Sequence, residues 1–351
     1  MNILKSRKTV VAVGLACALG SSWANLDISF AITGPVGLSV DGVGSNLAAV
    51  GQVQAVVPVG ATILKAFLYS AGLPSPFYAG APTTLAQYNA SGISLAGNTI
   101  NNFDTLVGAT SDRADIGRWF TARADVTALI TTLTAGAATD SFSWAVTEGA
   151  LNSLIDGEVL AVAYSLPGLT NATVAFLDGG QRTGGETTSI GFVNPLGDPS
   201  VAGYAAAFGI ASSFSCCNQA STITVNGTLL TRLAGSNDDG NDVAGFDGSL
   251  ITVGGIGDNP GNNVASYADD DELYDLKPFL TMGDTALTIR TSNATNDDNI
   301  FFAHLYITEA IKNINDTPVV PPASGAVPEP AAPALVLTAL AVLASTRRRQ
   351  R

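Results

Sequence analysis

The chain has 351 residues, of which 46% are hydrophobic and only 13% are charged, and its formal net charge is −13 at pH 7. This length and apolar content suffice for one large domain or two ordinary domains, each with a buried core. The acidic balance excludes a nucleic-acid-binding role, because such a surface repels phosphate; it attracts divalent cations or simply keeps an exported protein soluble.

The first 24 residues have the pattern of a secretory signal peptide. A positive start, an apolar run and small residues before the cleavage position follow one another, namely Lys5, Arg7 and Lys8, then residues 10–19, then Ser22 and Ala24. We expect cleavage between Ala24 and Asn25 and export of everything that follows.

The body, residues 25–312, alternates strand-like runs with turn signals of Gly, Asn, Asp and Pro. The runs are residues 26–32, 51–57, 62–70, 140–147, 158–166, 172–178, 221–227, 249–255, 285–292 and 299–308. Residues 123–136 and 271–280 are expected as short helices. The pattern predicts a mainly β body, an antiparallel β-sandwich or jelly roll with one or two short helices, and a division into two subdomains near residue 167.

Adjacent cysteines stand in the middle of this body. Cys216 and Cys217 are the only cysteines that remain after signal removal. In an oxidising compartment they can form a strained vicinal disulfide, stay as two reduced thiols or pair between molecules, and the sequence leaves these three states open.

Acidic residues gather near the end of the body, where 13 Asp and Glu lie between residues 235 and 300 against only Lys277 and Arg290. One loop offers a set of side-chain oxygens from Asp238, Asp239, Asn241, Asp242 and Asp247. Calcium binds six to eight oxygens in glycine-containing loops, so this loop is a candidate calcium site, although the final Glu of an EF-hand is absent. The alternative interpretation is a solvated loop rich in Asx turns.

Residues that carry catalysis are not recognisable in the sequence. The single histidine, His304, lies in a strand-like run, where we assign it to the face opposite Phe302 or to a strand edge and interpret it as structural. One histidine excludes a His-based zinc site, and no nucleophile elbow or phosphate loop occurs. Trp119, Trp144 and Tyr69 are expected in the core rather than on a sugar-binding surface.

The C-terminal part begins with a proline-rich stretch, residues 313–327, which predicts an extended linker. The apolar residues 331–345 follow, and as a helix they would span about 22 Å, less than the roughly 30 Å of a bilayer core. Arginines at the very end are expected to stay cytoplasmic, so the segment 328–351 predicts a short transmembrane helix with stop-transfer geometry.

This end of the chain resembles the PEP-CTERM sorting signal. Its three parts stand in order: the motif Val327, Pro328, Glu329 and Pro330, the apolar run, and the basic cluster Arg347, Arg348 and Arg349. The resemblance implies a Gram-negative bacterium that makes exopolysaccharide. It also implies two partners, the general secretion machinery and an exosortase, a membrane-embedded cysteine transpeptidase that cleaves near Pro-Glu-Pro.

These features predict an exported, non-enzymatic cell-surface or extracellular-matrix protein. Its tail would hold it transiently in the inner membrane until an exosortase processes it, and it would associate with extracellular polysaccharide. The alternative is a secreted carbohydrate-binding or carbohydrate-active β-sandwich protein, because paired carboxylates are abundant. That alternative requires a groove with an exposed Trp or Tyr beside two facing carboxylates. No cofactor follows with certainty from the sequence, and calcium is the one for which it offers candidate ligands.

Overall fold

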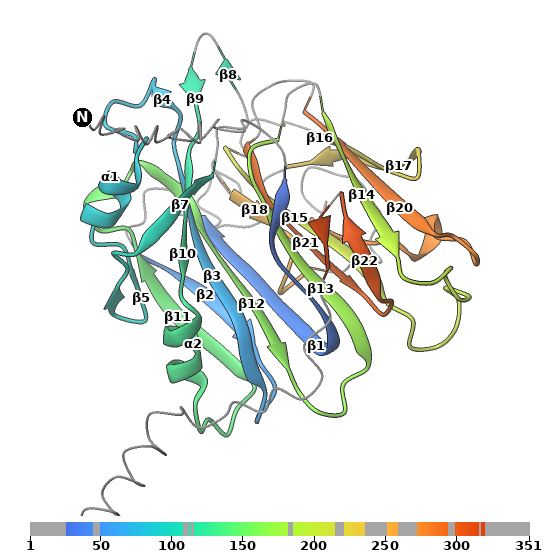
Figure 1. The fold of residues 1–351 in the computed structure, drawn as a ribbon. Coiled ribbons are helices and arrows are strands. Elements are labelled where there is room, and N and C mark those ends of the chain that lie inside the picture. Colours follow the sequence, from blue (N-terminus) through green and yellow to red (C-terminus); the bar gives the residue numbers. More distant parts are fainter. Residues whose placement is uncertain are drawn as a thin grey trace, which may run out of the picture.

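The computed structural model describes residues 26–44, 50–107, 112–113, 116–181, 185–214, 221–235, 251–258, 272–293, 299–315 and 317–319. This part of the chain is mainly β and forms several antiparallel sheets, which confirms the predicted class (Figure 1). Its helical elements are short: α1 (Leu85–Ala90), α2 (Thr127–Thr134) and the 3-10 turns η1 (Gly149–Leu151) and η2 (Lys277–Phe279).

A ten-stranded sheet runs through the middle of the molecule. In spatial order it contains β18 (Ile251–Val253), β15 (Ala206–Ser213), β21 (Asn299–Ile307), β13 (Asn171–Asp178), β1 (Asp27–Gly44), β12 (Ile155–Ser165), β3 (Thr62–Gly72), β10 (Thr121–Asp125) and β7 (Phe103–Val107), with β19 (Leu273–Asp275) paired to β15. Strand β1 is shared, because residues 27–35 pair with β13 and residues 36–44 pair with β12.

The sheet folds back on itself at β1. The rings of Tyr69 on β3 and Phe302 on β21 lie 4.9 Å apart, although three strands separate β3 from β21 in the sheet order. Strands in one sheet are about 4.8 Å apart, so the two parts must face each other. We call the part from β12 to β7, with residues 36–44, the inner N-sheet, and the part from β18 to β13, with residues 27–35, the inner C-sheet.

Each inner sheet is covered by an outer sheet. The outer N-sheet contains β2 (Val50–Val56), β11 (Ser141–Thr147), β5 (Ser94–Leu95) and β6 (Asn98–Thr99). The outer C-sheet contains β17 (Thr228–Ala234), β16 (Ser221–Val225), β20 (Ala286–Ser292), β14 (Glu186–Phe192), β22 (Ile311–Ile314) and β23 (Thr317–Pro318). A small ribbon of β4 (Ser75–Pro76), β9 (Gly117–Arg118) and β8 (Asp112–Arg113) projects from one end.

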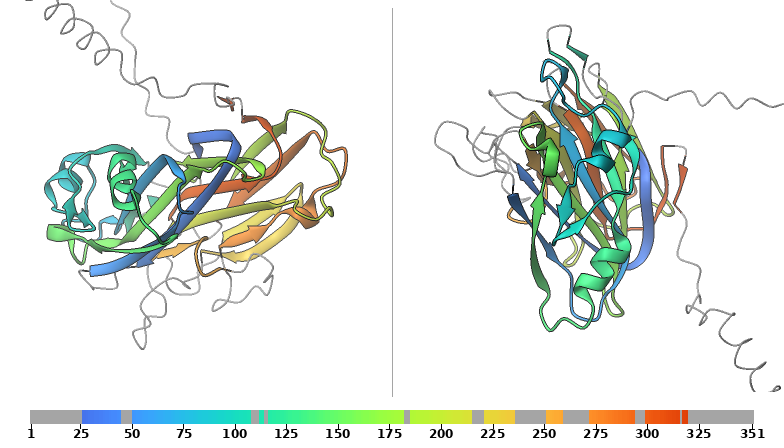
Figure 2. Two further views of the ribbon diagram at one scale, coloured as in Figure 1. Left: turned by 90° about the horizontal axis from the view of Figure 1, so that it is seen from below. Right: turned by 90° about the vertical axis from the view of Figure 1, so that its left-hand side faces the viewer.

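Three apolar cores separate these layers. One lies between the two N-sheets, one between the two C-sheets, and the third between the two inner sheets. Alternation along β12 explains how a strand serves two cores: Leu160 and Val162 face the outer N-sheet, whereas Val159 and Ala161 face the inner C-sheet. The views of Figure 2 show α1 and α2 beside the N-sheets, away from the outer C-sheet.

The turn between β12 and β13, residues 166–170, carries the chain from the N-sheets to the C-sheets. This crossing lies at the position where the sequence predicts a division near residue 167. The third core fills the space between the halves and holds aromatic side chains from both, among them Phe67 and Phe176. The halves therefore pack as one body in the part of the chain that the structure describes.

Two predicted helices differ in the structure. Residues 123–136 divide into the end of β10 and the helix α2, and the Asp125 carboxylate accepts a hydrogen bond from the Thr127 N–H just before the helix. The prediction of a helix over 271–280 is wrong, because strand β19 and the single turn η2 occupy its described part. Pro278 lacks the N–H that a longer helix would need, and Leu273 to Asp275 pair with β15.

The first residues of the predicted linker belong to the body. Ile314 ends β22 and is fully buried, and Val319 is 7% exposed in the core between the C-sheets. Strand β23 contains Pro318 and pairs only with β22, at the edge of the sheet, where proline is tolerated. No helix among the described residues is long and apolar enough to cross a membrane.

Candidate functional site

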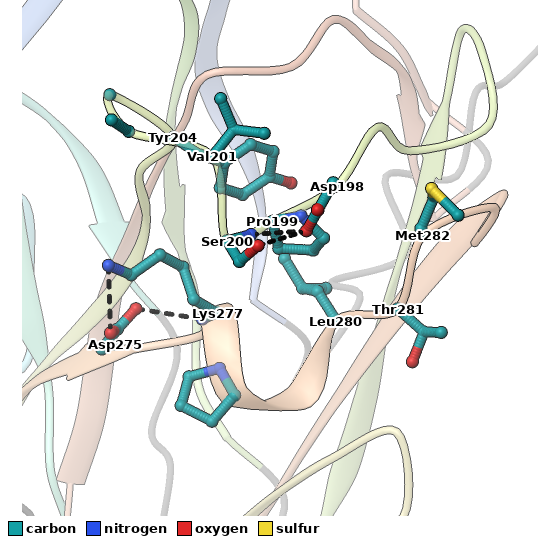
Figure 3. Close-up of a pocket in the computed structure, with 13 residues that line it drawn as sticks. Asp198, Pro199, Ser200, Val201, Tyr204, Asp275, Lys277, Leu280, Thr281 and Met282 are labelled. Atoms are coloured by element: carbon teal, nitrogen blue, oxygen red, sulfur yellow. Dashed lines mark hydrogen bonds and ion pairs between the residues drawn. The ribbon is translucent and has the colours of Figure 1, made fainter.

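We call the two C-sheets together the C-half and the two N-sheets together the N-half. An open groove lies on the C-half, between two connections that join strands of different sheets. It is a hollow of about 660 Å³, lined by residues 198–204 of the β14–β15 connection and by residues of the β19–β20 connection (Figure 3). Asp275 and Lys277 stand at one end, and Thr281 and Met282 stand at the other.

Backbone hydrogen bonds fix the two walls of the groove to each other. The Leu196 N–H donates to the Asp284 carbonyl at 2.8 Å, and the Gly283 N–H donates to the Leu196 carbonyl at 2.9 Å. The Leu196 side chain is buried in the core between the C-sheets, and Leu280 is buried there as well. The groove is therefore a preformed feature of the fold rather than a space between independent loops.

The polar groups of the groove have local partners but keep free capacity. Asp198 Oδ1 accepts hydrogen bonds from the Ser200 N–H at 2.9 Å and from the Ser200 hydroxyl at 2.7 Å, and these bonds lower the pKa of Asp198. At the other end, Asp275 Oδ1 accepts from the Lys277 N–H at 3.0 Å, while its Oδ2 lies 3.6 Å from Lys277 Nζ. Both carboxylates can still accept hydrogen bonds from a ligand.

Tyr204 gives the groove its aromatic surface. Its ring packs against the core between the C-sheets, and burial, with Glu309 and Asp284 nearby, raises the pKa of its hydroxyl to about 12. Apolar side chains are exposed on either side, with Val201 60% exposed and Met282 70% exposed. An aromatic ring, apolar contacts and a few carboxylates and hydroxyls suit a ligand that has both C–H faces and hydroxyl groups.

The three aromatic residues that the sequence predicts in the core are buried to different degrees. Trp119 and Tyr69 are fully buried, and Trp144 is partly buried against the core between the N-sheets, where its ring stacks on Phe142 with centroids 5.3 Å apart. Neither Trp119 nor Trp144 lies in the groove. Tyr204, which the sequence did not single out, is an aromatic residue that lines the groove.

His304 is a core residue. Its Nε2 lies 2.7 Å from the Gly254 carbonyl, and its ring centroid is 5.9 Å from that of Phe302. The prediction that it faces away from Phe302 or lies on an edge is wrong, because residues two apart in a strand share a face and β21 lies between β13 and β15. Burial lowers the pKa of His304 to about 4, so the ring is neutral at pH 7.

The other predicted site residues lie outside the described residues. These are the calcium candidates Asp238, Asp239, Asn241, Asp242 and Asp247, the pair Cys216 and Cys217, the cleavage residues Ala24 and Asn25, and the sorting motif from Val327 to Pro330 with Arg347, Arg348 and Arg349. Within the described ranges, no group of three or more His, Cys, Asp or Glu is arranged to hold a metal ion.

Sequence reasoning missed a second feature, a group of buried carboxyl side chains. Glu148, Asp156 and Glu158 are all at most 2% exposed, near one end of the inner N-sheet. The detectable signal was an acid placed inside an apolar strand, as in the run EVLAVAYS at residues 158–165. The groove left no such signal, because its residues come from two connections far apart in the sequence. Comparison with protein-family models, curated proteins and solved structures found no match.

Proposed function

We propose that this chain is an exported, non-enzymatic protein of the cell surface or extracellular matrix, on a β-sandwich body, sorted by its C-terminal segment. The observation that carries the proposal is the pairing of a cleavable N-terminal signal with a Pro-Glu-Pro motif, apolar run and arginine cluster at the other end. In this proposal an exosortase cleaves near Pro328, and the acidic body associates with exopolysaccharide. The neutral, core-bound His304 supports a structural use of the one histidine.

Mass spectrometry of the chain recovered from the producing cells tests the processing step. We expect a mature N-terminus at Asn25 and a C-terminus near Pro328, and an intact tail in cells that lack the exosortase. Glu329→Gln should block processing, whereas Pro321→Ala in the linker serves as the matched control and should be processed normally. An intact C-terminus at Arg351 in exosortase-competent cells would show that the proposal of processing is wrong.

The groove favours a second candidate, binding of a neutral carbohydrate. Tyr204 can contact a sugar ring, while Asp198 and Asp275 can accept hydrogen bonds from its hydroxyls. Calorimetric titration of the full chain with exopolysaccharide purified from the same cells tests this candidate. We expect Asp198→Asn and Tyr204→Ala to weaken binding at least several-fold. The exposed, distant Asp140→Asn should leave it unchanged, and equal binding by all variants would contradict a site in the groove.

A further inference from the structure

Three buried carboxyl side chains lie near one end of the inner N-sheet. Asp156 and Glu158 are at the start of β12, and Glu148 precedes η1 on the connection from β11. The exposed fractions are 0% for Asp156 and 2% for Glu148 and Glu158. Carboxyl groups are seldom buried this completely unless they are neutral or paired, so their presence here needs a physical reason.

A strand irregularity gives the two acids of β12 different neighbours. The pairing of β12 with β3 shifts between Ile155 and Gly157, which leaves Asp156 as the extra residue of a bulge. Glu158 stays in the ladder opposite Ser70, whose hydroxyl donates a hydrogen bond to Glu158 Oε1 at 3.2 Å. The bulge thus allows Asp156 to turn toward a different neighbour from the one that regular alternation would give.

That neighbour belongs to the other half. The Phe214 N–H and the Ser213 hydroxyl, at the end of β15 in the inner C-sheet, lie near the Asp156 carboxyl and lower its pKa. Phe214 adopts a positive φ of 61°, and its ring lies edge-on to that of Trp119, with centroids 5.3 Å apart. Asn299 Nδ2 donates to Ser213 Oγ at 2.6 Å. Asp156 therefore lies beside polar groups of the inner C-sheet.

The titratable groups around Asp156 and Glu158 disfavour ionisation. Burial raises the pKa of both carboxyls well above their ordinary values, and the nearby Glu148 raises both further. The Phe214 and Ser213 groups oppose this rise for Asp156, as the Ser70 hydroxyl does for Glu158. Burial, and then the nearby carboxyls of Asp156 and Glu158, raise the pKa of the Tyr88 phenol on α1.

We propose that Asp156, with its neighbours Glu158 and Glu148, forms a proton-dependent clamp that holds the inner N-sheet against the inner C-sheet at low pH and loosens as the pH rises. The sign follows from linkage. A carboxyl with a raised pKa binds protons more tightly in the folded than in the unfolded chain. Its contribution to stability is therefore complete below the ordinary carboxyl range, near pH 4, and is lost as the pH rises through the raised value.

Thermal unfolding of the full chain across pH provides the first test. The wild type should melt at progressively lower temperature as the pH rises, relative to Asp156→Asn/Glu158→Gln, whose side chains cannot ionise. Asp140→Asn removes an exposed acid and should follow the wild-type curve. Parallel curves for the wild type and the double variant would overturn the proposal. A second outcome would also overturn it: calcium or a chelator shifts the melting temperature of the wild type but not that of the double variant. A cation, rather than protons, would then neutralise the carboxylates.

A local reporter distinguishes opening of the contact between the two inner sheets, which we call the seam, from general unfolding. Trp119 becomes the only tryptophan of the chain when Trp23 and Trp144 are changed to Phe, and it contacts Phe214 across the seam. We expect its emission to shift to the red with rising pH before the β signal in circular dichroism is lost, and reversibly. Adding Asp156→Asn/Glu158→Gln should abolish that early shift. Coincident changes in both signals, or a shift that persists in the neutral variants, would contradict a clamp.

Discussion

At the residue scale, His304 shows how a single side chain can fit a core by means of its neighbours. Gly209 stands directly opposite it on β15, and a Cβ at this position would lie 2.1 Å from His304 Nε2. The absence of a side chain at Gly209 leaves room for the imidazole, and the Gly254 carbonyl satisfies one ring nitrogen. The pair therefore belongs to the packing of the fold rather than to catalysis.

The buried His304 should make the protein sensitive to acid. Its pKa of about 4, against an ordinary 6.5, means that the unfolded chain takes up the proton first. The contribution to stability is thus complete above pH 6.5 and is lost as the pH falls toward 4, a change of about 3 kcal/mol. Urea unfolding at pH 7.5 and pH 4.5 measures it. His304→Gln should be less stable at pH 7.5 but should lose less on acidification, and an equal loss would contradict this role.

Gly209→Ala should destabilise the fold by about 1–3 kcal/mol, because the new methyl group would collide with the imidazole in a packed interior. Gly197→Ala is a suitable control, since the nearest atom to its Cβ is a Glu309 carboxylate oxygen at 4.0 Å. Urea unfolding of both variants at pH 7.5 gives the comparison. If the two substitutions have the same effect, the close approach at Gly209 is not what fixes glycine there.

At the element scale, strand β2 is attached to the inner N-sheet by side chains. On one side it pairs with β11 through regular backbone hydrogen bonds. On the other side the Val56 N–H donates to Ser39 Oγ at 2.9 Å, and the Gln54 N–H donates to Asp41 Oδ2. Two polar residues of β1 thus replace the missing neighbour strand, which explains why Ser39 and Asp41 are buried.

Ser39→Ala and Asp41→Ala should each remove about 1 kcal/mol of stability and expose one amide of β2. Hydrogen exchange followed by NMR measures the effect at single residues. The Val56 amide should exchange faster in the first variant and the Gln54 amide in the second, whereas the amides of β2 that point toward β11 serve as internal controls. Uniform acceleration along β2 would indicate that the whole strand detaches.

Alternation of apolar and polar residues predicted the strands that face a single core or have a strong pattern, such as β3, β11 and β20. It missed strands with a weak pattern, such as β14, which is rich in threonine, and β15, in which small residues pack against facing chains. Most of the groove could not be predicted, because Tyr204 and Lys277 come to line one groove only when the β14–β15 and β19–β20 connections pair. The burial of Glu148, Asp156 and Glu158 was not predicted for a similar reason, because burial depends on how the sheets pack together.

At the scale of the whole molecule, a charged network joins the inner sheets across the third core. Arg123 on β10 forms an ion pair with Asp178 on β13, and the Tyr69 hydroxyl donates to the same Asp178 oxygen at 2.8 Å. The Arg123 guanidinium also lies over the ring of Phe67, 4.5 Å from its centroid. Each half therefore supplies part of a network that neither half could complete alone.

Arg123→Met should cost about 3–5 kcal/mol, because it leaves the Asp178 carboxylate nearly buried without its cation. The double variant Arg123→Met/Asp178→Leu should recover a good part of this loss, which a double-mutant cycle from urea unfolding would measure. Lys65→Met breaks the more exposed pair with Asp125 and should cost at most about 1 kcal/mol. An additive cycle for Arg123 and Asp178 would show that the two side chains are energetically independent.

Both ends of the described body are fixed in the same core, between the C-sheets. The Leu26 N–H donates to Glu186 Oε1 at 2.8 Å, and the Val319 N–H donates to the Lys312 carbonyl at 2.9 Å. Both side chains are buried in that core. A pulling force between these two points would therefore act on the C-half, and the N-half would carry none of the tension. Under mechanical load applied between Leu26 and Val319, we expect the N-half to stay folded while β22 and β23 detach first.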